Sequence, residues 1–340
     1  MDMPTAIASV IAGQDMSRSD MLDIMRCIMS GEASDAQIGG FLVGLRMKGE
    51  SIDEIVAAAT VMRELASPVH TELENLVDTC GTGGSGSNKF NVSTASAFVA
   101  AAAGAKVAKH GNRSASSKSG SADVLEAAGA EIMLSPMQVG RCLDSVGVGF
   151  LFAQSHHSAM KHAIGPRRQL LTRTIFNLLG PLTNPAGATR QLIGVYGMEW
   201  VRPIAEVLRD LGSVHVMVVH SEDGLDELSI SASTHVAELV DGEIKEYVLM
   251  PEEFGLSRSP LSELIIEDSH SSLDLLKKAL SAEHDGASNI VSLNAGAAIY
   301  VAGLCDSLHA GVEMAQDAIG SGMAKEKMNE FVQFTQQVAD

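Results

Sequence analysis

Apolar residues recur at helical spacing through the first part of the chain. Three segments with this spacing, MLDIMRCIM, IGGFLVGLRM and IVAAATVMREL, each follow a serine that suits a helix N-cap. Ser34 and Ser51 have Gln37 and Glu54 three residues later, which is the spacing of a capping box. The methionine-rich stripes of these segments are typical of a packed core. The pattern predicts a small all-helical domain over residues 1–70.

After this region, short apolar strands alternate with helices, as in βαβ units that build a largely parallel sheet. We expect strands over residues 76–79, 106–108, 132–134, 148–152, 192–196 and 215–219. Asp241-Gly242, between VAELV and EIKEYVL, predicts a hairpin. The fold class that we expect is α/β, with a small all-helical N-terminal domain and a larger α/β domain over residues 71–340. A mostly parallel central sheet flanked by helices forms this second domain.

The composition narrows the possible partners and compartments. The chain has 340 residues and a formal net charge of −18, which argues against nucleic acid as a partner. No apolar run approaches the roughly 18 residues that cross a bilayer, and the N-terminus lacks the pattern of a signal peptide. The four cysteines are scattered without a CxxC motif. We therefore expect a soluble, cytoplasmic protein that binds no membrane.

The distribution of the charges is more informative than their total. Residues 79–122 and 145–198 contain no Asp or Glu, although 42 of the 340 residues are acidic. Each of these windows nevertheless holds five Lys and Arg residues. Two segments that were simply buried would be poor in charges of both signs. We interpret the two windows as the lining of a cleft that binds an anion.

A glycine-rich segment, DTCGTGGSGS, runs from Asp78 to Ser87, and NVST follows at residues 91–94 as the hydroxyl-capped start of a predicted helix. Glycines let backbone amides approach phosphate oxygens, and the helix dipole favours negative charge. The segment has neither the Gly-Lys-Ser/Thr ending of a P-loop nor the acid that follows a dinucleotide-binding GxGxxG. It predicts a phosphate cradle of another type, with a purely structural turn as the alternative.

A second polar loop, KHGNRSASSKSGS, spans residues 109–121 between a predicted strand and a predicted helix. It holds three cationic residues and five serines in 13 positions. Such a loop is either solvated or bound to a ligand, because a hydrophobic core would not accept it. Its place before a helix favours an anion as that ligand.

Two further segments carry opposite charges. Residues 155–168, SHHSAMKHAIGPRR, supply guanidinium groups that suit a carboxylate. Their histidines lack the i, i+4 spacing of a helical zinc site. Residues 222–229, EDGLDELS, form an acidic loop just beyond a predicted strand. Carboxylates opposite a phosphate cradle suit Mg²⁺, and an exposed acidic turn is the alternative.

Taken together, these motifs resemble those of the anthranilate phosphoribosyltransferase family. GTGG, FNVSTA, KHGNR, SKSGSADVLE, HHSAMKH, RTIFNLLGPLTNPA and GLDELS occur in this order and at compatible spacing along the whole chain. The resemblance implies transfer of the phosphoribosyl group of phosphoribosyl pyrophosphate (PRPP) to the amine of anthranilate, in tryptophan biosynthesis. It also implies Mg²⁺ as cofactor and a homodimer formed through the helical domains. A segment near residues 160–185 is expected to rejoin the helical domain.

The resemblance also assigns site residues, position by position. The Mg²⁺ ligands that it implies are Ser93, Asp226 and Glu227. The anthranilate contacts that it implies are Gly81, Asn112 and Arg167. The PRPP contacts that it implies are Gly81, Thr82, Gly83, Gly84, Ser85, Lys89, Asn91, Val92, Ser93, Thr94, Lys109, His110, Gly111, Asn112, Arg113, Ser114, Ala115, Ser116, Ser117 and Ser121.

Three of these residues are expected to act in catalysis. Negative charge accumulates on pyrophosphate as it leaves the anomeric carbon, and Lys109 is expected to stabilise that charge together with Mg²⁺ and the GTGG amides. Arg167 is expected to hold the carboxylate of anthranilate and so to aim its amine. The neutral amine needs no strong base, and His110 is a candidate proton relay.

Two positions depart from the pattern of the family. Ser85 stands where an aspartate is usual, and Lys89 stands where a threonine usually precedes FN. Both changes make the loop more positive. We hypothesise that Lys89 partly replaces cation charge near the pyrophosphate.

Two other functions are alternatives at this stage. Pyrimidine nucleoside phosphorylases share the plan of a helical and an α/β domain, but the complete KHGNR and GPLTNPA matches argue against that activity. A non-catalytic binding relative, even one that binds nucleic acid, is disfavoured by the charge of −18 and by the retained acidic pair.

Overall fold

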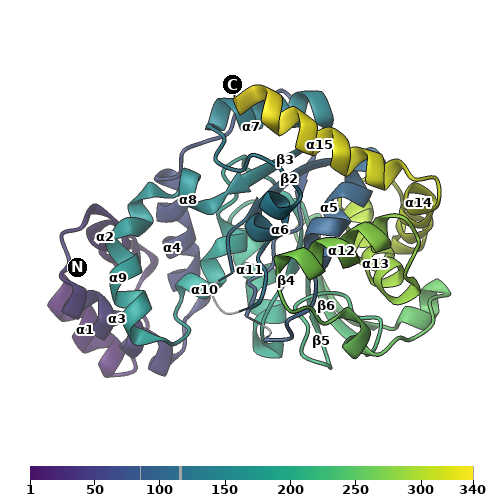
Figure 1. Ribbon diagram of the computed structural model, residues 1–340. Coiled ribbons are helices and arrows are strands. Elements are labelled where there is room, and N and C mark those ends of the chain that lie inside the picture. The colour runs from purple at the N-terminus through teal and green to yellow at the C-terminus, as the bar shows by residue number, and fades with distance from the viewer. Residues whose placement is uncertain (85, 115–116, 340) are drawn as a thin grey trace.

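The structure is a computed structural model that describes residues 1–84, 86–114 and 117–339. The chain opens with a bundle of helices at one end of the molecule (Figure 1). They are α1 (Met3–Ile11), α2 (Arg18–Ser30), α3 (Asp35–Lys48) and α4 (Ile52–Glu64). Both expected capping boxes are present, at the N-termini of α3 and α4. The prediction of an all-helical N-terminal region is confirmed.

A seven-stranded sheet lies at the centre of the rest of the chain, in the order β3-β2-β1-β4-β5-β6-β7. Neighbouring strands from β3 to β5 are parallel, and β6 and β7 are antiparallel. The strands are β1 (Leu76–Asp78), β2 (Lys106–Gly111), β3 (Val148–Phe152), β4 (Arg190–Gly194), β5 (His215–Ser221), β6 (Thr234–Val240) and β7 (Glu243–Leu249). The expected hairpin is formed, with Asp241 and Gly242 at positive φ in its turn. The mostly parallel sheet is therefore confirmed.

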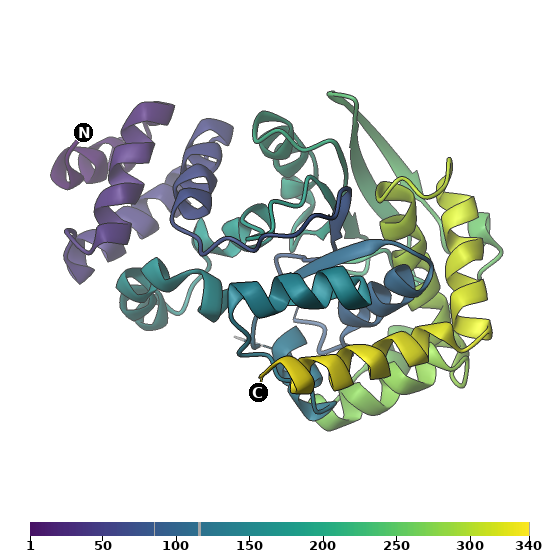
Figure 2. The same cartoon turned by 90° about the horizontal axis from the view of Figure 1, so that it is seen from above.

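Helices cover both faces of this sheet (Figure 2). Alternate residues of β5 serve the two faces, since Met217 and Val219 join one hydrophobic cluster and Val216 and Val218 join another. The first cluster includes residues of α5 (Val92–Ala102), α6 (Ser121–Ala127), α12 (Ser269–Leu280), α13 (Asp285–Val301), α14 (Leu308–Gly320) and α15 (Met323–Ala339). The second includes residues of α11 (Val201–Asp210), α10 (Phe176–Leu179) and the N-terminal bundle.

The remaining helices lie before and after β3 in the chain. The helix α7 (Pro136–Val146) packs against β3, and α8 (Ala153–His156) and α9 (Lys161–Leu170) follow that strand. Ala163 of α9 and Ile175 are buried in the same cluster as the N-terminal bundle, so the chain returns to the bundle after β3. Short 3-10 helices are η1 (Ser158–Met160), η2 (Gly180–Leu182), η3 (Met198–Trp200), η4 (Pro251–Phe254) and η5 (Leu261–Leu264). Among the described helices, none is long and apolar enough to span a bilayer.

The expected strand over residues 132–134 is wrong, because none of the described strands includes this segment. Ile132 and Leu134 are buried in two different clusters, whereas Met133 is exposed. The neighbouring amide of Glu131 donates to Thr335 Oγ1 at 3.1 Å instead of to a strand. The alternating pattern therefore anchors an irregular connection between α6 and α7.

The strand order indicates which edge of the sheet can bind a ligand. It reverses at β1, because the chain continues to β2 and β3 on one side and then to β4 and β5 on the other. Loops that diverge at such a point leave a crevice at the carboxyl ends of the strands. The glycine-rich segment follows β1, the 109–121 loop continues from β2, and the acidic loop follows β5. The topology therefore brings the three motifs to one edge.

A buried ion pair stabilises the helical bundle. Glu54 is completely buried and accepts hydrogen bonds from Lys48 Nζ at 2.9 Å and from the amides of Met16 and Ser51 at 3.0 and 2.7 Å. Removing one partner of a buried pair costs about 3–5 kcal/mol. We expect Glu54→Ala to lower the free energy of unfolding by this amount in urea titrations. Glu64→Ala removes a half-exposed partner of Arg26 and should lower the free energy of unfolding by less than about 1 kcal/mol. Equal losses for Glu54→Ala and Glu64→Ala would contradict this account.

Candidate active site

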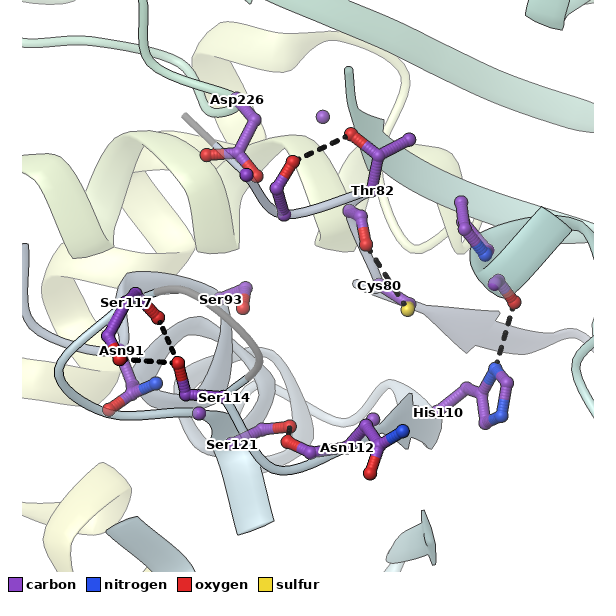
Figure 3. A pocket seen from close by; sticks show the side chains of 18 of the residues that line it. Cys80, Thr82, Asn91, Ser93, His110, Asn112, Ser114, Ser117, Ser121 and Asp226 are labelled. Atoms are coloured by element: carbon purple, nitrogen blue, oxygen red, sulfur yellow. Dashed lines mark hydrogen bonds between the residues drawn. The ribbon is translucent and has the colours of Figure 1, made fainter. Parts of the chain in front are cut away.

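A cavity of about 400 Å³ lies at the edge of the sheet where the strand order reverses. The glycine-rich segment, the 109–121 loop, α9 and the acidic loop all contribute to its wall. Figure 3 shows Thr82 and Asp226 on one side of this space, facing Asn91, Ser93, Ser114 and Ser117 on the other.

Most residues that the family resemblance implies for the site line this cavity. They are Gly81, Thr82, Gly83, Gly84, Lys89, Asn91, Ser93, Lys109, His110, Gly111, Asn112, Arg113, Ser114, Ser117, Ser121, Arg167, Asp226 and Glu227. Val92 and Thr94 are buried within α5 and are not part of the wall. Ser85, Ala115 and Ser116 lie outside the described residues.

The N-terminus of α5 points its first turn toward the cavity without a side-chain cap. The expected hydroxyl cap is wrong: Asn91 occupies the N-cap and makes no capping hydrogen bond. Its Oδ1 instead accepts hydrogen bonds from Ser119 Oγ at 2.9 Å and from Ser272 Oγ at 2.7 Å. Asn91 thus ties the start of α5 to the 109–121 loop, and its side chain leaves the first-turn amides to an anion.

Lys109 is a buried cation at the floor of the cavity. It belongs to β2, which extends three residues beyond the expected strand and includes Gly111. Lys109 Nζ lies 3.3 Å from both Ser93 Oγ and Thr79 Oγ1. Burial lowers the pKa of Lys109, and no carboxylate among the described residues forms an ion pair with it. Its charge is therefore available to an anion in the cavity.

His110 lies beside Lys109 and is neutral. Its Nδ1 lies 3.0 Å from the carbonyl oxygen of Gly180, which only accepts hydrogen bonds, so Nδ1 carries the proton. Burial, together with the neighbouring His157, lowers the pKa of His110 to about 3. Among the described residues, Nε2 has no hydrogen-bond partner. A relay that requires a protonated imidazole near neutral pH is therefore at odds with this environment.

The acidic pair after β5 already contacts a cation. Lys89 Nζ lies 2.9 Å from Asp226 Oδ1 and 3.2 Å from Glu227 Oε2. Burial would lower the pKa of Lys89, but the two carboxylates outweigh it and hold that pKa above its ordinary value. Burial raises the pKa of Glu227 to about 7, with the charge of Asp226 acting in the same direction. The pair is therefore a site that selects positive charge.

Arg167 presents a guanidinium on another side of the cavity. It lies in α9, half-buried, with its guanidinium carbon 5.1 Å from the centre of the Phe176 ring. Burial lowers its pKa, and none of the carboxylates in the described part of the chain pairs with it. Arg113 differs, because its guanidinium pairs with Glu126 and Asp123 of α6. Of these two arginines, Arg167 is the one whose charge remains available to a ligand.

Other residues shape the site in ways that the sequence did not predict. Arg173 donates a hydrogen bond to the carbonyl oxygen of Gly84 and stacks over Tyr196, with 4.3 Å from its guanidinium carbon to the ring centre. Arg173 therefore holds the glycine-rich segment. Its position in a window without acids was a signal for an anion site, but not for this contact. Ser272 of α12 donates a hydrogen bond to Asn91, and no motif in the sequence indicated this contact.

Comparison with known proteins agrees with this architecture. Two family models match, the glycosyl transferase family helical bundle domain over residues 4–66 and the glycosyl transferase family a/b domain over residues 73–325. An anthranilate phosphoribosyltransferase of Marinomonas sp. (strain MWYL1) is 60% identical over 98% of this chain and 97% of its own.

Solved structures show the same similarity. That of anthranilate phosphoribosyltransferase from Thermus thermophilus has a TM-score of 0.92 at 42% identity, over 97% of this chain and 99% of that one. The enzyme from Saccharomyces cerevisiae, in complex with PRPP and Mg, has a TM-score of 0.90 at 26% identity over 98% of both chains. The chain belongs to the anthranilate phosphoribosyltransferase family.

Proposed function

We propose that this protein transfers the phosphoribosyl group of PRPP to the amine of anthranilate, giving N-(5-phosphoribosyl)anthranilate and pyrophosphate. One observation carries the proposal: a single cavity is lined by the Arg167 guanidinium, by a phosphate cradle and by an acidic pair that selects cations. None of the described carboxylates forms an ion pair with Arg167. An aromatic carboxylate, a diphosphate and a divalent cation are the ligands that match these three features.

The cradle holds the leaving group. Gly83 and Gly84 have positive φ, which lets the loop present its backbone to a phosphate. The first-turn amides of α5 and the ammonium of Lys109 add positive charge on the same side. Because charge grows on pyrophosphate as the bond to the anomeric carbon breaks, these groups bind the transition state more strongly than the substrate.

Magnesium fits the donor set, since Ser93, Asp226 and Glu227 offer hydroxyl and carboxylate oxygens and the acidic pair already contacts a cation. When bound, Mg²⁺ supplies electrostatic stabilisation of the leaving pyrophosphate. Residues of the chain position the second substrate, since Arg167 orients anthranilate. His110 is neutral, so its Nε2 can accept a hydrogen bond beside the cavity.

Arg167→Ala should affect the KM for anthranilate much more than the KM for PRPP. We expect the KM for anthranilate to rise by about 10- to 150-fold, because a charge-assisted carboxylate contact is worth about 1.5–3 kcal/mol and a factor of ten corresponds to about 1.4 kcal/mol. The KM for PRPP should change by less than about threefold. Steady-state kinetics with each substrate varied in turn measures both. Arg168→Ala, at the exposed neighbouring position, is the control and should leave both constants unchanged; an equal rise for both substrates in Arg167→Ala would argue against the assignment.

The pyrimidine nucleoside phosphorylase alternative is tested by product identification. The protein is incubated with PRPP, anthranilate and Mg²⁺ in one sample and with thymidine or uridine and phosphate in another, and products are identified by mass spectrometry. Phosphoribosylanthranilate in the first sample only is the expected result. Release of free base in the second sample would favour the phosphorylase.

Assembly and location are part of the same proposal. We propose a cytoplasmic homodimer that forms through the helical bundle, as the family resemblance implies. Ile11 of α1 and Met47 of α3 support it, since these apolar side chains are 73% and 84% exposed. We also propose a division at residues 70/71, with the segment near 160–185 joined to the bundle; the burial of Ala163 and Leu178 beside the bundle supports it. Sedimentation analysis of the wild type and of Met47→Glu tests the dimer.

A further inference from the structure

The ammonium of Lys89 takes the place of a cation at the acidic pair. Lys89, Asp226 and Glu227 have side chains that are only 12%, 9% and 11% exposed, and Lys89 Nζ contacts both carboxylates. A divalent ion that reached the same oxygens would meet the ammonium within contact distance. Two cations at so short a separation repel each other strongly in a poorly hydrated site. Mg²⁺ and the present position of Lys89 Nζ are therefore in competition.

The backbone of Lys89 is fixed, so the competition must be resolved by its side chain. Lys89 pairs with Ile265 in an isolated antiparallel bridge. On either side of it, the amide of Phe90 donates to the carbonyl oxygen of Leu264 and the amide of Ile266 donates to that of Asn88, both at 3.0 Å. This pairing fixes where the lysine side chain starts. The flexible four-carbon stem lets the ammonium rotate away from the carboxylates while the backbone stays in place.

The same cavity offers Lys89 a new partner. The glycine-rich cradle and the acidic pair both line it, together with Lys89 itself. A diphosphate in the cradle would bring negative charge into reach of the displaced ammonium. Among the described residues that line the cavity, Asp226 and Glu227 are the only acidic ones, so without a bound anion the displaced ammonium would find no other carboxylate there.

We propose that Lys89 is an internal competitor for the divalent cation: it occupies the acidic pair in the substrate-free protein, weakens metal binding there, and moves to the diphosphate when the metal enters. Metal loading thereby becomes coupled to occupation of the phosphate cradle. This inference rests on the proposed function for the identity of the diphosphate, whereas the competition itself concerns the substrate-free protein alone.

The test measures binding of Mn²⁺, used as the probe for the divalent site, to the full-length protein without substrates. Free Mn²⁺ is followed by electron paramagnetic resonance at constant pH. Lys89→Met keeps the stem and removes the charge, and we expect it to bind Mn²⁺ at least tenfold more tightly than the wild type, which corresponds to about 1.4 kcal/mol. Lys89→Arg should stay near the wild-type affinity. Lys277→Met makes the same substitution at an exposed position of α12 and is the control; it should leave the Mn²⁺ affinity unchanged.

A second variant locates the gain. The double variant Lys89→Met/Asp226→Asn should lose the added affinity, because the gain depends on the acidic pair. Melting temperatures give an independent readout: MgCl₂ should raise that of Lys89→Met more than that of the wild type. If Lys89→Met fails to fold, Lys89→Thr serves in its place.

Equal Mn²⁺ affinities for the wild type and Lys89→Met would overturn the proposal, and so would a gain that persists in the double variant. Neither result would affect the transferase assignment, which is judged from product formation. Conversely, a wild-type protein without transferase activity would reject the proposed function and leave the competition measurable.

Discussion

Asp226→Asn is expected to lower kcat/KM by about 10²–10³-fold at saturating Mg²⁺, the loss that follows when one group that stabilises a charged transition state is removed. The amide is nearly the same size as the carboxylate but brings no charge to the cation, and it leaves Lys89 with Glu227 alone. Steady-state rates over a range of Mg²⁺ concentrations measure the effect, and we expect the variant to need more metal for half-maximal rate.

Asp241→Asn makes the same chemical change in the β6–β7 turn, at a positive φ that asparagine tolerates. It should keep the full rate and the wild-type dependence on Mg²⁺. Full activity in Asp226→Asn would show that the acidic pair does not hold the metal.

Gly194→Ala is expected to reduce activity by about 10²-fold or more through the backbone alone. A Cβ at Gly194, the last residue of β4, would lie 1.6 Å from the carbonyl oxygen of Asp226. The acidic loop would have to move away, and a displacement on the order of 1 Å at a catalytic group costs about 10²-fold. The carbonyl oxygen of Gly194 also accepts a hydrogen bond from the amide of Thr82 at 2.8 Å, so the glycine-rich segment would shift as well.

Gly320→Ala is the matched control for that substitution. Gly320 ends α14, is exposed, and has no atom within 4 Å of the position of an added Cβ. It should retain full activity and a wild-type melting temperature. Kinetics and circular dichroism on both variants separate a displaced site from an unfolded protein. A Gly194→Ala variant with wild-type kinetics would contradict the close contact between β4 and the acidic loop.

Local rules predicted much of the fold. Capping boxes at Ser34 and Ser51 and the Asp241-Gly242 turn depend on residues three or fewer positions apart, and all three are present. The strand expected over residues 132–134 failed because burial alternates there for tertiary reasons, with two clusters receiving Ile132 and Leu134. Short apolar segments do not distinguish these two cases.

The sequence predicted which residues line the site but not which of them contact one another. The motifs indicated that an acidic pair and a glycine-rich segment with Lys89 share one cleft, and the cavity contains them all. That Lys89 contacts Asp226, 137 positions away, depends on how the loops after β1 and β5 meet at the edge of the sheet. The neutral state of His110 also depends on burial, which no local pattern reveals.

The most direct test of the central claim is the initial rate at which anthranilate fluorescence disappears when the purified protein is mixed with anthranilate, PRPP and Mg²⁺. Loss of emission only when all three are present, and its near absence with Asp226→Asn, is the result that this account predicts. Emission that stays constant with the wild-type protein over a wide range of Mg²⁺ concentrations would contradict it.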